Sequence, residues 1–135
     1  CLRVRKLKPS EQGSVGEEGD SGEGSMTDGK YLLETIKASK MPIGISSRMD
    51  QNYVYEEMPM EKDVSYYLFS DGYIDQFGGP NQRKFMKKGF KKLILEIQGQ
   101  PMKMQREILN NRIEEWRGNT SQIDDILVVG IRIEN

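Results

Sequence analysis

Two nearly continuous apolar runs of strand length constrain the fold of this 135-residue chain more than any other feature. The first run covers residues 64–69 and stops at a Ser-Asp-Gly turn signal, and the second and stronger run covers residues 126–133. Apolar runs of this length that lack strict alternation are typical of buried strands. We therefore predict a strand at each place, and a central position in the sheet for the first.

Three further segments carry strand signals. Residues 2–7 and 31–36 are rich in β-formers and could pair as a hairpin, and residues 53–58 are a plausible edge strand. The hairpin would enclose residues 9–29, which hold six acidic residues, six glycines and no Lys or Arg. This composition predicts a flexible acidic Gly-rich loop. The loop lacks the Lys-Ser/Thr ending of a phosphate loop and the oxygen side chains of a calcium loop.

Two amphipathic helices are predicted between the apolar runs. The first has apolar residues spaced by four, three and four positions, at Met86, Phe90, Leu93 and Ile97. Gly99 suits the C-terminal end of this helix, and Pro101 suits the first turn of the next. The second helix carries one apolar stripe and stops at Gly118; the stripe consists of Met102, Leu109, Ile113 and Trp116. Strands followed by a helix pair and a last strand indicate an α+β fold.

The first helix also has a basic side, to which five lysines contribute: Lys84, Lys87, Lys88, Lys91 and Lys92. Such a side could be a solvated face, a docking surface for an acidic protein, or a contact for nucleic-acid phosphates. The chain has no nucleic-acid recognition motif and no aromatic platform beside these lysines. We therefore expect no nucleic-acid partner.

The composition excludes several chemistries. With no His and one Cys, the chain cannot build a Ser-His-Asp triad, an imidazole base, a Cys/His zinc site or an internal disulfide. Catalysis must depend on carboxylates, Lys, Tyr, hydroxyls or a bound ion. No apolar run approaches the ~18 residues of a membrane span, and the first residues lack the apolar block of a signal peptide. These features predict a cytoplasmic chain without a membrane segment.

Carboxylates stand where both apolar runs meet solvent. Asp71 follows the first run, and Asp124 and Asp125 directly precede the second. If the two strands are antiparallel neighbours, these ends coincide in space. A divalent cation such as Mg²⁺ or Mn²⁺ would offset the clustered negative charge and could activate a water molecule. Spacing alone leaves an ordinary turn and a loop cap as alternatives, because Asp-Gly is common in turns.

Three motifs in the chain together resemble a known family. Residues 67–80 read YLFSDGYIDQFGGP, residues 41–44 read MPIG, and residues 122–131 read QIDDILVVGI. Their order and spacing resemble the stage II sporulation protein E type of bacterial metal-dependent Ser/Thr phosphatases, also called PPM or type 2C. The resemblance implies part of a β-sandwich flanked by helices, with two Mn²⁺ or Mg²⁺ ions at one end. By the same resemblance Asp71 and Asp124 would bind metal, and Asp125 would be either a further ligand or a residue that holds the turn.

The implied activity is hydrolysis of phosphoserine or phosphothreonine by a metal-activated water, on a signalling protein such as an anti-sigma-factor antagonist. The family's other metal ligands lie in an earlier Asp-Gly motif, which we expect to precede Cys1. We therefore expect residues 1–135 to be the C-terminal portion of one phosphatase domain, weakly active or inactive alone. A sensor domain could precede it in the parent protein. The alternative is a non-catalytic, phosphatase-like interaction module.

Overall fold

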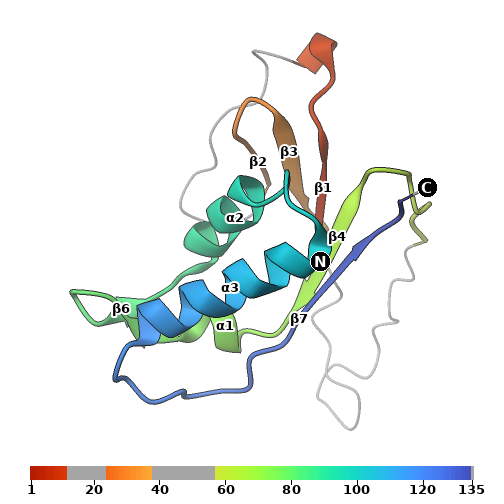
Figure 1. Cartoon of the computed structure of the whole chain (residues 1–135). Coiled ribbons are helices and arrows are strands. Elements are labelled where there is room, and N and C mark those ends of the chain that lie inside the picture. Colours follow the sequence, from red (N-terminus) through yellow and green to blue (C-terminus); the bar gives the residue numbers. More distant parts are fainter. Residues whose placement is uncertain (12–23, 38–56, 135) are drawn as a thin grey trace, which may run out of the picture.

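The computed structural model describes residues 1–11, 24–37 and 57–134 of the chain. Its main element is a five-stranded sheet with the order β2-β3-β1-β4-β7, in which all neighbouring strands are antiparallel (Figure 1). The sheet strands are β1 (Leu2–Lys6), β2 (Ser25–Thr27), β3 (Tyr31–Thr35), β4 (Ser65–Phe69) and β7 (Val128–Arg132). The other elements are η1 (Pro9–Glu11), α1 (Gly72–Asp75), β5 (Phe77–Gly78), β6 (Arg83–Lys84), α2 (Lys87–Glu96) and α3 (Met102–Arg117).

The strand pairing confirms the main expectations from the sequence. β1 and β3 pair with Leu2 opposite Thr35 and Lys6 opposite Tyr31, which is the predicted hairpin. β4 lies between β1 and β7, so the first apolar run is an interior strand. The second apolar run forms β7, which lies at the edge of the sheet among the described strands.

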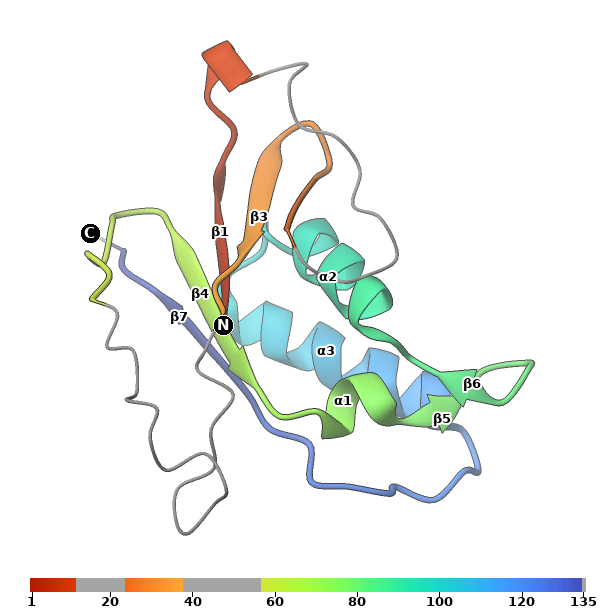
Figure 2. The same cartoon turned by 180° about the vertical axis from the view of Figure 1, so that it is seen from behind.

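Both long helices pack on one face of the sheet (Figures 1 and 2). Leu2 and Val4 point toward this face from alternate positions of β1, and they join Tyr67 of β4 in the main hydrophobic cluster. Phe90 and Ile94 of α2 contribute the helix side of the same cluster, and both are fully buried. The α+β class is confirmed, and the described residues supply one sheet of the expected sandwich.

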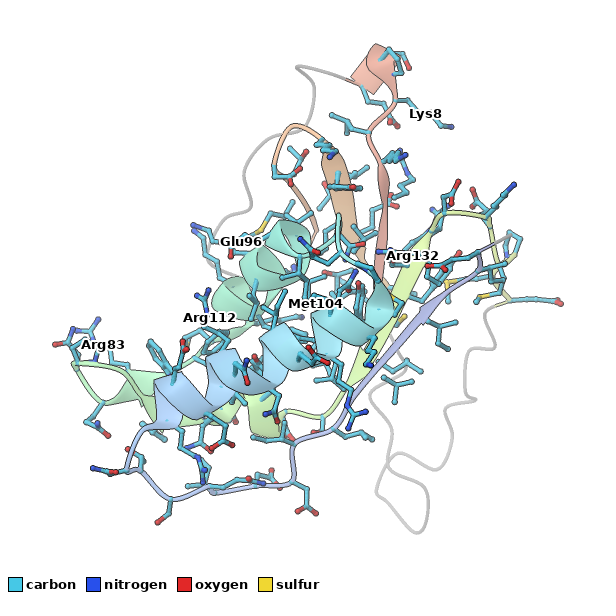
Figure 3. All side chains as sticks on the ribbon, in the orientation of Figure 1. Lys8, Arg83, Glu96, Met104, Arg112 and Arg132 are labelled. Atoms are coloured by element: carbon cyan, nitrogen blue, oxygen red, sulfur yellow. The ribbon has the colours of Figure 1, made fainter. Side chains whose placement is uncertain are left out.

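A buried polar network ties the turn between α2 and α3 to the sheet. The Tyr67 hydroxyl donates to Gln105 Oε1 at 2.5 Å and accepts from Gln98 Nε2 at 2.5 Å. Arg132 of β7 donates to the backbone oxygens of Gln98 and Gln100, and Figure 3 labels it near the start of α3. Because Tyr67, Gln98 and Gln105 are buried and paired, they fix where the helix pair sits on the sheet, and the half-buried Arg132 adds contacts from β7.

The opposite face of the sheet is divided between charge and apolar surface. Arg3 of β1 forms an ion pair with Glu34 of β3, and Arg5 forms another with Glu11. An apolar strip lies toward the other edge, on β4, on β7 and on the residues that flank β7. The residues of this strip are each 39–60% exposed. The strip consists of Leu68, Leu127, Val129, Ile131 and Ile133.

No helix of the described part of the chain is long and apolar enough to cross a membrane.

The predicted loop over residues 9–29 is wrong at both ends. Residues 9–11 form η1, because Glu11 accepts two hydrogen bonds from Arg5 and one from the Lys8 backbone. Ser25–Thr27 form β2, because Met26 is buried in the main cluster opposite Leu33 of β3. The central part of the loop, residues 12–23, lies outside the described residues, as do the 41–44 motif and most of the edge strand predicted at 53–58.

Three residues of the first predicted helix differ from expectation. Lys84, placed on the basic side of the helix, belongs to β6 and forms an ion pair with Asp75. Met86, placed on the apolar stripe, is 56% exposed and precedes α2 in a left-handed conformation with φ of 71°. Lys91, placed on the basic exterior, is fully buried. The second half of α2 is buried on more than one side, through Phe90, Leu93, Ile94 and Leu95. The prediction assumed that only one side of the helix faces the core, so it could not foresee burial on a second side.

Candidate functional site

The pairing of β4 with β7 brings the two acidic segments together. Phe69, the last residue of β4, lies opposite Val128, the first residue of β7. One step beyond, the Ser70 backbone N–H donates to the Leu127 oxygen at 3.0 Å. The chain therefore leaves β4 into Asp71 beside the point where Asp124 and Asp125 lead into β7. The predicted coincidence of these strand ends is found in the structure.

The Ser70 side chain joins the two segments directly. Its hydroxyl donates to the Asp125 backbone oxygen at 2.7 Å and accepts from the Leu127 N–H at 3.0 Å. One hydroxyl thus satisfies two backbone groups of the segment that enters β7. We call this arrangement the Ser70 bridge.

Gly72 allows the close approach of the same two segments. A Cβ atom at this position would lie 2.3 Å from the Asp125 oxygen and 3.3 Å from the Asp124 carbonyl carbon. These are backbone atoms that cannot rotate away, so a side chain at residue 72 would force the segments apart. The Gly of the Ser-Asp-Gly motif is therefore required by packing against the Asp124–Asp125 backbone.

The three predicted carboxylates all lie on the surface. Asp71 precedes α1 and makes no side-chain capping hydrogen bond. Asp124 Oδ1 accepts from the Asp125 N–H at 2.7 Å, which orients this carboxylate against its own turn. Asp71, Asp124 and Asp125 are exposed, so their remaining oxygens are accessible from solvent.

These carboxylates have the chemistry that Mn²⁺ and Mg²⁺ require, since both ions prefer oxygen ligands. Within residues 1–11, 24–37 and 57–134, however, no three Asp, Glu, His or Cys side chains group closely enough to hold an ion. Asp71, Asp124 and Asp125 therefore fit as contributors to a metal site, and they do not complete one.

Sequence reasoning identified the carboxylates and missed the groups that hold their backbones. Ser70 and Gly72 flank Asp71 in the motif, so the signal was present in the sequence. Their roles depend on partners 53 or more positions away, at Asp125 and Leu127. Only the strand pairing reveals those partners.

Comparison with known proteins identifies the family and the fold of the chain. The chain is similar to the SiaA-PP2C domain of Pseudomonas aeruginosa, with a TM-score of 0.66 and 23% sequence identity. The match covers 98% of this chain and 42% of that domain, so the chain spans less than half the length of the domain it matches. No curated protein matches the chain. The family model of stage II sporulation protein E (SpoIIE) matches residues 26–134, and the chain therefore belongs to the SpoIIE family.

Proposed function

We propose that residues 1–135 are the C-terminal portion of one PPM-type phosphatase domain that hydrolyses phosphoserine or phosphothreonine on a signalling protein. The observation that carries this proposal is the joining of the Ser-Asp-Gly segment to the Asp124–Asp125 segment at one end of β4 and β7. Membership of the SpoIIE family and the PP2C-like fold support the same reaction class.

In this proposal Asp71 and Asp124 are ligands to Mn²⁺ or Mg²⁺, and Asp125 is a third ligand or a turn residue. When bound, the two ions would supply an activated water and neutralise charge on the phosphoryl oxygens. The chain's own contribution is to hold two carboxylate segments at a fixed separation, through the Ser70 bridge and the contact at Gly72. An octahedral ion takes six oxygens, so water, substrate and other acidic side chains must supply the rest.

The proposed substrate is a phosphorylated anti-sigma-factor antagonist, met in the cytoplasm, and a sensor domain of the parent protein would control the reaction. This choice follows the family resemblance of the motifs. The exposure of all three carboxylates supports a protein substrate, because a phosphorylated side chain must reach the site from solvent.

Titration calorimetry with Mn²⁺ tests the proposed ligands. We expect weak binding by the unmodified chain and its loss in both Asp71→Asn and Asp124→Asn. Asp63→Asn is the matched control, because Asp63 is an exposed aspartate that precedes the opposite end of β4. Unchanged Mn²⁺ affinity in both ligand variants would refute the assignment. Asp125→Asn separates its two roles, since a ligand loses affinity and a turn residue retains it.

The reaction is tested on a longer protein that contains this chain. We expect Mn²⁺-dependent release of phosphate from a phosphorylated antagonist and from a small aryl phosphate, abolished by Asp71→Asn. Release that persists in this variant would contradict the proposed chemistry.

One observation favours a second candidate, a non-catalytic interaction module. The described residues contain no complete set of metal-binding side chains. A module of this kind would bind its partner without Mn²⁺, and Asp71→Asn would leave that binding unchanged.

A further inference from the structure

A groove lies between α3 and the segment that forms β7, next to the candidate metal site. Its volume is about 780 Å³. Leu109 and Ile113 line it from α3, and Ile126 and Val128 line it from the facing segment. The groove therefore has two apolar walls, which come from α3 and from the segment that leads into β7, the next element along the chain.

The groove opens beside the carboxylates of the candidate site. Tyr73, which lines the groove, lies two residues after Asp71, and Ile126 directly follows Asp125. One end of the groove is therefore close along the chain to Asp71 and Asp125, and we expect a segment held in the groove to lead toward these carboxylates.

The facing wall leads into a strand, because Val128, Val129 and Gly130 belong to β7 and Ile126 and Leu127 precede it. Residues 126–130 line the groove, and at ~3.3 Å per residue they extend for roughly 13 Å. Among the described strands β7 has a neighbour on one side only, β4, so part of its backbone N–H and C=O groups face outward. A wall of this kind matches four or five residues of an extended peptide, which can add to a free strand edge.

The charge around the groove selects the chemistry of that peptide. Lys103 and Arg106 of α3 line it and are exposed, and no acidic residue lines it. Neither cation forms an ion pair within the described part of the chain. A smaller pocket beside α2 differs in this respect, because there Lys88 and Lys92 are accompanied by Asp28 and Glu96. Of these two pockets, the groove along α3 is the one whose uncompensated charge favours an acidic ligand.

We propose that this groove binds an extended segment of the phosphoprotein substrate that combines acidic with apolar side chains and neighbours its phosphorylated residue. The apolar side chains would contact Leu109, Ile113 and Val128, and the acidic ones would pair with Lys103 and Arg106. The part of this inference that directs the segment toward Asp71 rests on the proposed function. Binding of the segment itself requires no metal ion.

The test uses fluorescence anisotropy with a labelled, unphosphorylated peptide of alternating Glu and Leu, titrated with the full chain without metal. We expect saturable binding that weakens at least tenfold in the double variant Lys103→Glu/Arg106→Glu. The matched control is Lys88→Glu/Lys92→Glu, which reverses the same number of charges on α2 and should leave the affinity unchanged. A peptide N-methylated at alternate residues should bind more weakly, because it loses backbone hydrogen bonds to the edge of β7.

Three results would overturn the proposal. The first is equal affinity in the unmodified chain and in Lys103→Glu/Arg106→Glu. The second is loss of binding in the α2 variant, which would move the site to the basic side of α2. The third is absent peptide binding together with chain dimers that dissociate in Lys103→Glu/Arg106→Glu, which would assign the groove to a second copy. Asp71→Asn separates the metal-ligand hypothesis from the groove hypothesis. Retained peptide binding together with lost Mn²⁺ binding supports both. Unchanged Mn²⁺ binding refutes the ligand role of Asp71 and leaves the groove hypothesis unaffected.

Discussion

Removal of the Ser70 hydroxyl is the most direct perturbation of the candidate site. In Ser70→Ala the Asp125 oxygen and the Leu127 N–H each lose a hydrogen-bond partner, at 2.7 and 3.0 Å respectively. An intramolecular hydrogen bond contributes about 0.5–1.5 kcal/mol net, and this exposed turn can recover part of that from water. We expect a loss of about 1–2 kcal/mol in the free energy of unfolding, or about 4–7 °C in Tm for a domain of this size.

The larger expected effect is on metal binding. The Ser70 bridge holds the segment of Asp71 against that of Asp124, and groups that orient metal ligands typically contribute 10- to 100-fold in affinity. Ser70→Ala should therefore weaken Mn²⁺ binding about tenfold or more, measured by titration calorimetry at a temperature where the variant is fully folded. Ser70→Thr retains a hydroxyl and should restore most of this loss.

Ser121→Ala is the matched control, because Ser121 is an exposed serine in the segment that leads to Asp124. It should change neither thermal unfolding by circular dichroism nor Mn²⁺ affinity. If Ser70→Ala lowers Tm but binds Mn²⁺ like the unmodified chain, the Ser70 bridge supports the fold and does not position ligands. If it changes neither quantity, the reasoning from the two hydrogen bonds is wrong.

Three further predictions concern the fold around the site. The hydrogen bonds from Arg5 and from the Lys8 backbone lower the pKa of Glu11 to about 2, so its contribution to stability is present above pH ~4.5 and is lost as pH falls toward 2. Glu11→Gln should remove this part of the pH dependence in acid unfolding curves, and an unchanged curve would contradict it. Tyr67→Phe leaves the buried amides of Gln98 and Gln105 each short of a partner, which should cost about 2–3 kcal/mol in urea unfolding; a change below 0.5 kcal/mol would refute the network. Gly72→Ala should cost about 1–3 kcal/mol or more by the same assay, because its Cβ would meet a backbone oxygen. Gly130→Ala should lower the free energy of unfolding by less than Gly72→Ala. A Cβ atom at residue 130 would lie 2.6 Å from the end of the Met102 side chain, which is flexible and can move away. A larger loss in Gly130→Ala than in Gly72→Ala would contradict this reasoning.

The strongly patterned elements could be predicted from the sequence, and the reason lies in burial. The run at 64–69 became β4 because a strand in the interior of a sheet needs apolar or aromatic residues, such as Tyr66 and Tyr67, at successive positions. The helix over residues 102–117 could be predicted because Leu109 and Ile113 recur on its buried side and Gly118 ends it with a positive φ of 53°.

Elements stabilised by distant contacts escaped prediction. β2 is three residues long and depends on Met26 packing beside Leu33, which no local pattern in a Gly-rich acidic segment reveals. The burial of Lys91 likewise depends on what surrounds the second half of α2. For the candidate site, the position of Asp71 and Asp124 at adjacent strand ends could be predicted once the two strands were assumed to be neighbours. The Ser70 bridge could not, because it joins a side chain to the backbone of a residue 55 positions away.

The run at 126–133 leads to a last prediction, because it is apolar at positions that face both sides of the sheet. The helices cover one side, on which Gly130 lies against Met102 and Tyr67. On the other side Val129 and Ile131 are 39% and 42% exposed. A continuous apolar strand normally has both faces covered, so this strip is suited to the second sheet of the expected sandwich.

The double variant Val129→Lys/Ile131→Lys tests whether that side is open in this chain. Because both side chains are already partly in water, we expect the free energy of unfolding to change by less than about 1 kcal/mol. Self-association at high concentration, measured by sedimentation velocity, should decrease, since the variant places two like charges on the apolar strip. Val4→Lys on the covered side is the contrast, and it should unfold the chain because Val4 is fully buried. A loss of 3 kcal/mol or more in the double variant would mean that the strip is already covered in solution, and the argument for a second sheet at this face would fail.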